Sequence, residues 1–269
     1  MVKKPPRGQV FLADNEVLRR IADVARLAPD ETVVEIGMGH GELTQHLVRR
    51  AAEVVAVELE ARFVEEAAAA FARWDNLTIV QGNFLDVEWR EVVPAGRRVV
   101  VVGNVPFYIT SPILRRLFGH RADVLRWSLL MQREVAARIC APASADAYGA
   151  LSVKMQFWGR PELALVVPAA AFEPVPEVDA AVVTYYYYDD PAAGLARPEL
   201  FDPFVDFIFG GRRKKLANRL TTLLAGERGG EELTAMLAGA GFDADVRPER
   251  LGVADFTRLF ALVEPLIKL

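Results

Sequence analysis

The 269-residue sequence predicts an α/β fold, in which an open sheet of parallel strands is followed by a small all-helical domain. Two observations predict the sheet: short apolar runs recur along the first two-thirds of the chain, and segments with helical spacing separate them. A third observation predicts the helical domain, because beyond residue 200 the apolar residues recur at helical spacing.

Four predicted strands, at residues 32–36, 54–58, 77–81 and 99–103, are apolar runs of the kind that is typical of strands buried on both faces of a parallel sheet. Further strands are predicted at residues 126–132, 152–158 and 178–188. The helices between them are predicted from apolar spacing and from residues that favour helices. They lie at residues 17–28, 42–51 and 61–74.

A change of composition marks the predicted domain boundary. The segment DDPAAGLARP, residues 189–198, holds two prolines and a glycine and has no periodicity, which is typical of a linker. We therefore assign residues 1–188 to the α/β domain, 189–199 to a linker and 200–269 to the helical domain. The first helix of that domain carries one apolar stripe, formed by Phe201, Phe204, Val205, Ile208 and Phe209.

Composition limits the setting and the partners of the protein. The single cysteine, Cys140, excludes an internal disulfide, and the N-terminus lacks the apolar stretch of a secretory signal, so we expect a cytoplasmic protein. No window approaches 18 consecutive apolar residues, so we expect no membrane partner. The three histidines do not cluster with cysteines at metal-ligand spacing, and we expect no metal.

A glycine-rich loop follows the predicted strand at residues 32–36. Gly37, Gly39 and Gly41, in EIGMGHGELT, stand directly before a helix, where glycines let a ligand approach the backbone closely. Glu58 ends the next strand, where a carboxylate can accept both hydroxyls of a ribose. Together the loop and the acid predict a cofactor that contains a nucleoside.

The spacing and charge of the loop distinguish NAD from S-adenosylmethionine. A dinucleotide loop reads G-x-G-x-x-G, whereas this loop reads G-x-G-x-G and is preceded by Glu35. A carboxylate there attracts the cationic methionine end of S-adenosylmethionine and repels a pyrophosphate. We therefore predict S-adenosylmethionine as the cofactor, and we expect Asn83, after the next strand, to face the edge of its adenine.

The strand VVVVG ends in Asn104, Val105, Pro106 and Phe107, residue types that a strand end does not need. An exocyclic base amine is a poor nucleophile, because its lone pair is delocalised into the ring. The Asn104 side-chain oxygen and the Val105 carbonyl would accept the two N–H hydrogens of the amine and stabilise its developing positive charge. Pro106 would stiffen this turn, and Phe107 would stack on the base.

These motifs belong to a longer series that runs along nearly the whole chain. The series comprises GQVFL (8–12), EIGMGHGELT (35–44), VELE (57–60), QGNFLD (81–86), GNVPFYITSPIL (103–114), MQREVAARI (131–139), FEPVPEVDAAVV (172–183) and GGRRKKLANRL (210–220). In it the sequence resembles the ribosomal RNA adenine dimethyltransferases, most of all those of the small-subunit (16S) rRNA. The resemblance implies a Rossmann-like class I methyltransferase sheet. It also implies N6,N6-dimethylation of two adjacent adenosines in an immature 30S particle, and we expect a monomer.

The resemblance also implies a set of site residues. The expected donor-site residues are Gln9, Val10, Leu12, Glu35, Gly37, Gly39, Gly41, Glu58, Leu59, Asn83, Phe84 and Asn104. Phe107 and Phe172 are expected to sandwich the target adenine. The sequence departs from the family pattern, which usually has Asn or His at Val10, Pro or Ala at Met38, Asp at Asn83 and Leu-Pro-Tyr at residues 105–107.

A basic strip precedes or opens the second helix of the helical domain. Its cations are Arg212, Arg213, Lys214, Lys215 and Arg219. Cations at the positive end of a helix are disfavoured by about 0.3–1 kcal/mol each, a cost that a bound phosphate would reverse. We predict that the strip binds RNA and that Arg115 and Arg116 extend the contact toward the pocket, the alternative being a solvated helix face.

Three other functions stay open on the sequence alone. The first is a large-subunit rRNA dimethyltransferase of the macrolide-resistance type, which has the same chemistry. The second is a non-catalytic ribosome-assembly factor that binds RNA, which the departures at Val10 and Asn83 would suit. The third, an NAD dehydrogenase, leaves Asn104 to Phe107 without a purpose.

Overall fold

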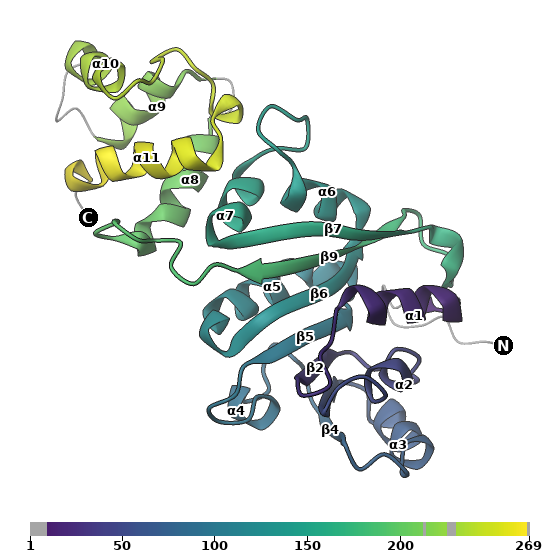
Figure 1. Ribbon diagram of the computed structural model, residues 1–269. Coiled ribbons are helices and arrows are strands. Elements are labelled where there is room, and N and C mark those ends of the chain that lie inside the picture. The colour runs from purple at the N-terminus through teal and green to yellow at the C-terminus, as the bar shows by residue number, and fades with distance from the viewer. Residues whose placement is uncertain (1–9, 212–213, 225–229, 268–269) are drawn as a thin grey trace. The chain divides into compact units, whose positions relative to one another are not determined.

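The computed structural model describes residues 10–211, 214–224 and 230–267, which fold into two compact units (Figure 1). Of the described residues, the first unit contains 10–136 and 161–187, and the second contains 137–160 and those from 188 onward. Residues 137–160, which the sequence analysis assigned to the α/β domain, thus belong to the helical unit.

Within the described residues of the first unit, one sheet has seven strands in the order β4-β3-β2-β5-β6-β9-β7. These strands are β2 (Thr32–Ile36), β3 (Glu53–Glu58), β4 (Leu77–Gln81), β5 (Val99–Asn104), β6 (Val124–Gln132), β7 (Gly159–Val167) and β9 (Ala180–Tyr187). Neighbouring strands from β4 to β6 are parallel, and β9 runs antiparallel to β6. The arrangement confirms the predicted open α/β sheet.

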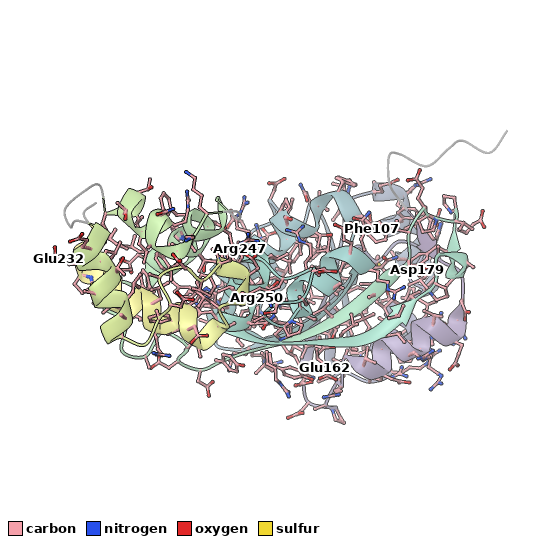
Figure 2. All side chains as sticks on the ribbon, turned by 90° about the horizontal axis from the view of Figure 1, so that it is seen from above. Phe107, Glu162, Asp179, Glu232, Arg247 and Arg250 are labelled. Atoms are coloured by element: carbon pink, nitrogen blue, oxygen red, sulfur yellow. The ribbon has the colours of Figure 1, made fainter. Side chains whose placement is uncertain are left out.

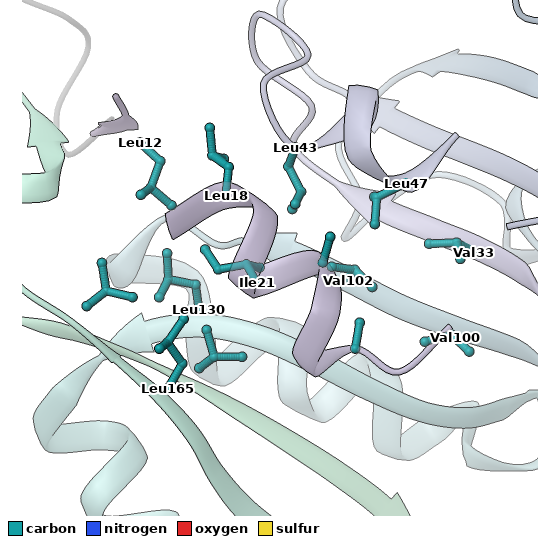
Figure 3. Packing of buried hydrophobic residues seen from close by; sticks show 14 of the residues in the cluster. Leu12, Leu18, Ile21, Val33, Leu43, Leu47, Val100, Val102, Leu130 and Leu165 are labelled. Carbon is teal, nitrogen blue, oxygen red and sulfur yellow. The ribbon is translucent and has the colours of Figure 1, made fainter. Parts of the chain in front are cut away.

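Helices α1 (Asn15–Val24) and α2 (Thr44–Leu47) cover one face of this sheet. The Asp14 carboxylate begins α1 by accepting hydrogen bonds from the next free backbone N–H groups, a standard N-cap. Figure 3 shows the packing, in which Leu18, Ile21, Leu43 and Leu47 meet strand residues such as Val33, Val100 and Val102. The remaining helices of the parallel region are α3 (Ala61–Ala70), α4 (Trp89–Val92) and α5 (Thr110–Gly119), and α6 (Arg133–Cys140) follows β6.

A separate two-stranded sheet joins the N-terminal segment to a turn far along the chain. Strand β1 (Phe11–Leu12) pairs antiparallel with β8 (Phe172–Glu173), and Leu12 lies opposite Phe172. This pairing brings two segments that the sequence analysis assigned to the donor and the target side by side.

The prediction of a strand at residues 152–158 is wrong, because these residues form helix α7 (Ala150–Trp158). Val153, Met155 and Phe157 are buried and alternate with partly buried residues, as in a strand. In the helix the polar side chains between them contact other segments of the helical unit. The Lys154 ammonium, for example, lies 2.7 Å from a carboxylate oxygen of Asp206. The sequence analysis also missed β7, which directly follows this helix.

The helical unit is built around α8, the helix with the predicted apolar stripe. Its helices are α7, α8 (Phe201–Phe209), α9 (Leu216–Leu223), α10 (Gly230–Gly239) and α11 (Val253–Val263). All five residues of the stripe are buried, which confirms that prediction. The Phe157 ring stacks on Phe201 with 3.8 Å between ring centroids, so α7 is part of this core. No helix in the described ranges is long and apolar enough to cross a membrane.

Candidate methyl-donor and base site

A cleft lies in the first unit at the carboxyl ends of β2, β3, β4 and β5, where open α/β sheets bind ligands. Eleven of the predicted site residues line it: Val10, Leu12, Gly37, Gly39, Glu58, Leu59, Asn83, Phe84, Asn104, Val105 and Pro106. Residues that line it but were missed include Phe11, Met38, Glu42, Phe63 and Tyr108. Gln9 lies outside the described residues.

Two glycines of the loop line the cleft, and the third lets a neighbouring ring pack closely. Gly37 and Gly39 have φ angles of +72° and +54°, and a Cβ added to Gly37 would meet nothing within 4 Å. Gly41, at φ +83°, does not line the cleft, and its Cβ would lie 2.4 Å from the Phe71 ring. The lack of a side chain at Gly41 lets the Phe71 ring pack closely, and a contact between Gly41 and the donor stays a prediction.

Glu58 is oriented toward the glycine loop by two backbone N–H groups. The Gly39 N–H donates to one carboxylate oxygen at 2.9 Å, and the Glu60 N–H donates to the other at 2.9 Å. Each oxygen keeps further acceptor capacity, as an ionised carboxylate has about four lone-pair sites. The side chain is only 5% exposed, so this acceptor pair is held in one position on the cleft wall.

Glu35 does not line the cleft, in contrast to its predicted donor-site role. It is 1% exposed in the middle of β2, and the Thr44 hydroxyl donates to its carboxyl group at 2.6 Å. Burial raises the pKa of Glu35 to about 8, and the nearby Glu42 and Glu58 carboxylates act in the same direction. Burial therefore weakens the attraction that this carboxyl group would exert on a cation.

Asn83 lines the cleft, but its amide is used within its own turn. The Leu85 N–H donates to the side-chain oxygen at 3.1 Å, and the amide nitrogen donates to Asp86 at 2.7 Å. This Asx-type turn orders the backbone after β4. The neighbouring Phe84 ring, 5% exposed, adds an apolar patch to the wall.

Asn104 stands at the end of β5 with its amide in a defined orientation. The amide nitrogen donates to the Val10 carbonyl at 3.3 Å, which leaves the side-chain oxygen as its free acceptor among the described contacts. The Val105 N–H donates to the Leu130 carbonyl at 3.3 Å, and Pro106 has no N–H to offer. Among the described contacts, this corner therefore offers the Asn104 side-chain oxygen as an acceptor, and neither Val105 nor Pro106 has a free N–H.

The two rings predicted to sandwich the base do not line the cleft. Phe172 is 2% exposed and packs in the core with Leu12 and Leu18, because its strand pairs with β1. Phe107, labelled in Figure 2, is half-buried and packs against the same cluster. The sandwich of the target adenine stays a prediction, and the most exposed aromatic side chain on the cleft wall is that of the next residue, Tyr108.

Two of the cations predicted to bind RNA are used inside the fold. The Arg116 guanidinium donates to the carbonyls of Leu85 and Val87, and burial lowers its pKa. Arg219 donates to the carbonyl of Phe207 near the end of α8, and its guanidinium lies 4.1 Å from the Phe207 ring centroid. Both contacts satisfy backbone acceptors, so neither side chain is free to reach a phosphate.

The other predicted cations fall into two groups. Arg115, Lys214 and Lys215 are exposed, and Lys215 lies 2.8 Å from Asp245. Arg212 and Arg213 lie outside the described residues. The helical unit also exposes the arginines that flank Pro248 and Glu249, namely Arg247 and Arg250 (Figure 2). Sequence reasoning missed them because they stand singly among acids, without the density of the basic strip.

Other candidate chemistry is not supported by the described part of the chain. It contains no group of three or more His, Cys, Asp or Glu side chains that could hold a metal. Cys140 is partly buried, and burial raises the pKa of its thiol to about 11, so the reactive thiolate is disfavoured at neutral pH.

Comparison with known proteins gives one consistent family. The sequence model of the family described as ribosomal RNA adenine dimethylase matches residues 2–264. A protein of Anoxybacillus flavithermus named ribosomal RNA small subunit methyltransferase A is 33% identical over 98% of this chain and 91% of its own length. A protein of the same name from Streptococcus gordonii is 36% identical over 94% of this chain and 89% of its own length.

Solved structures agree with the fold. A crystal structure of a dimethyladenosine transferase from Plasmodium falciparum aligns with a TM-score of 0.82 at 21% identity, over 95% of this chain and 98% of the other. The 23S rRNA methyltransferase ErmE aligns with a TM-score of 0.77 at 25% identity, over 94% and 99% of the two chains. The sheet is thus that of a class I methyltransferase, as expected, and the chain belongs to the ribosomal RNA adenine dimethylase family.

Proposed function

We propose that this protein transfers methyl groups from S-adenosylmethionine to the N6 amines of two adjacent adenosines in small-subunit rRNA, giving N6,N6-dimethyladenosine during ribosome biogenesis. The observation that carries the proposal is the acceptor corner of Asn104, Val105 and Pro106 on the wall of the cleft that also holds Glu58. Support for the small subunit comes from the relatives of that name, which are 33% and 36% identical, against 25% for the 23S enzyme.

The cleft fits S-adenosylmethionine on its own geometry. Two glycines in the left-handed region open the backbone on one side, and the oriented Glu58 carboxylate stands where ribose hydroxyls would donate. Leu59, 62% exposed, and Phe84 supply apolar surface for an adenine. When bound, the cofactor supplies a methyl group on a positively charged sulfur, which is open to attack by a nitrogen lone pair.

Asn104 and Val105 prepare the nitrogen for that attack. The hydrogen bond from the Asn104 amide to Val10 turns the Asn104 side-chain oxygen away from Val10, so this oxygen can accept one N–H of the base amine. The Val105 carbonyl accepts the other N–H, and both oxygens stabilise the positive charge that develops on the nitrogen. No general base is needed, because the amine loses its proton to water after the transfer.

RNA docking is proposed for the exposed cations of both units. Lys214 and Lys215 precede α9, Arg115 lies on α5, and all three are exposed. Such side chains contact phosphates and position an RNA without reading its sequence. We propose that the bound RNA is part of an immature 30S particle, and action as a cytoplasmic monomer stays a prediction.

Transfer of a labelled methyl group tests the proposed function. We expect the wild type to label small-subunit rRNA in immature 30S particles, and we expect Asn104→Ala to lose nearly all activity while binding the cofactor in calorimetry. Asn15→Ala, which removes an exposed amide outside the cleft, serves as the matched control and should stay active. Labelling of naked large-subunit RNA alone would refute the choice of substrate, and full activity of Asn104→Ala would refute the mechanism.

A further inference from the structure

Tyr108 is the most exposed aromatic side chain on the wall of the cleft. It is 68% exposed, whereas Phe63 and Phe84, which also line the cleft, are 1% and 5% exposed. Among the described residues, the large exposed hydrophobic side chains of the cleft are Leu59 and Tyr108. The Tyr108 ring is therefore the most accessible planar surface of the cleft.

Leu59 and Tyr108 stand on opposite sides of the glycine loop. Leu59 follows β3, and Tyr108 follows β5, while β2 and its loop lie between these strands in the sheet. Leu59 adjoins Glu58, the proposed acceptor for the cofactor ribose. Tyr108 instead lies just beyond the Asn104 corner, on the other side of the loop from the proposed ribose acceptor.

The backbone that carries Tyr108 is held in a defined turn. Tyr108 is the middle residue of the 3-10 helix η1 (Phe107–Ile109). The Ile109 N–H donates to the Pro106 carbonyl at 3.0 Å, and the Thr110 hydroxyl donates to the Phe107 carbonyl at 3.2 Å. Because Phe107 packs against the core, this turn holds the Tyr108 side chain outward. Tyr108 therefore loses little conformational freedom when a ligand binds.

We propose that Tyr108 stacks on the nucleotide next to the target adenosine, an inference that rests on the proposed function. The target amine must reach Asn104 and Val105 inside the cleft, whereas the Tyr108 ring is largely in solvent at its edge. A neighbouring base on the same strand is the planar group that remains outside when the target enters. Base–aromatic stacking is tolerant of sequence, which suits a site that treats two adjacent adenosines in turn.

The test uses short single-stranded RNAs in which 2-aminopurine replaces one of two adjacent adenosines. 2-Aminopurine lacks the N6 amine, so the remaining adenosine is the one that can react, and the fluorescence of the probe falls when it stacks. We expect quenching with the wild type and with Tyr108→Phe, and loss of quenching with Tyr108→Ala. Tyr188→Ala, which removes a 50% exposed tyrosine outside the cleft, is the matched control and should behave as the wild type.

Kinetics and cofactor binding complete the test. Loss of a stacking contact of about 1–3 kcal/mol raises the KM for RNA roughly 5- to 150-fold, and we expect kcat and cofactor affinity to change little. Quenching and KM at wild-type values in Tyr108→Ala would overturn the inference, as would a selective loss of cofactor affinity. If the wild type quenches the probe but labels no small-subunit rRNA in immature 30S particles, the proposed function fails while the stacking contact stands.

Discussion

Replacing Glu35 by glutamine is expected to stabilise this protein, by an amount that grows with pH. Glu35 is buried beneath the glycine loop, and burial raises its pKa to about 8 from an ordinary value of 4.5. The folded chain therefore keeps a proton on this carboxyl group over a pH range in which the unfolded chain loses it. Within that range, rising pH favours the unfolded state.

The magnitude follows from the distance between the two pKa values. They differ by about 3.5, and each whole unit corresponds to about 1.4 kcal/mol, so the cost is on the order of 5 kcal/mol at pH 8 and about 3 kcal/mol at pH 7. Below pH 4.5 both states bind the proton and the cost vanishes. Glutamine cannot ionise, and its side-chain oxygen still accepts the hydrogen bond from Thr44.

Urea unfolding of the wild type and Glu35→Gln at pH 5, 6, 7 and 8 measures this effect. We expect the difference in the free energy of unfolding to rise steadily in favour of Glu35→Gln, and we expect its cofactor affinity to match that of the wild type. Glu65→Gln, an exposed acid on α3, is the control and should show no such trend. A difference that does not change with pH, or a variant less stable than the wild type at pH 8, would refute the reasoning.

Three further outcomes follow from packing and from hydrogen bonds. Gly103→Ala should lower the free energy of unfolding by about 1–3 kcal/mol in urea, because the new Cβ would lie 2.8 Å from the Ile36 carbonyl oxygen; an unchanged midpoint would contradict this. Phe172→Ala should lower it by about 3–5 kcal/mol, since the ring is buried, and a small loss would mean that the ring is free. Arg115→Met should reduce the salt dependence of RNA binding, because Arg115 is exposed. Arg116→Met should instead lower the melting temperature of the protein, because Arg116 donates to backbone carbonyls. The reverse pattern would reject the proposal that Arg115, and not Arg116, contacts RNA.

Most of the parallel strands were predictable because they are buried on both faces, the exception being the edge strand β4. A segment such as β5 is a continuous run of valines, and no other common setting in a soluble domain requires that pattern. The segment 152–158 was not predictable in the same way. Its alternating apolar residues fit a strand, but the Gln156 amide donates to the carbonyls of Ile139 and Ala141, and such contacts with distant segments support a helix.

Some residues of the site were also predictable from the sequence, and others were not. Glu58 and Asn104 were predictable because each ends a parallel strand, and strand ends of one sheet meet at one edge. The burial of Glu35 and Phe172 away from the cleft wall was not predictable, because the direction of a side chain depends on partners that the local sequence does not reveal. Tyr108 was overlooked for a related reason: only the burial of its neighbour Phe107 shows which of two adjacent rings faces the cleft.

Each departure from the family pattern can be explained by the atoms through which that residue contacts the rest of the protein. At Val10 the contact to Asn104 uses the backbone carbonyl, which every residue type supplies, so loss of a polar side chain leaves this contact intact. Met38 is 2% exposed and packs with Ala56 and Ala67, which places its side chain in the core beneath the loop. At Asn83 an uncharged amide makes both side-chain hydrogen bonds of the turn. Because these positions act through the backbone, through packing or within one turn, the acceptor corner at Asn104 can persist while their side chains vary.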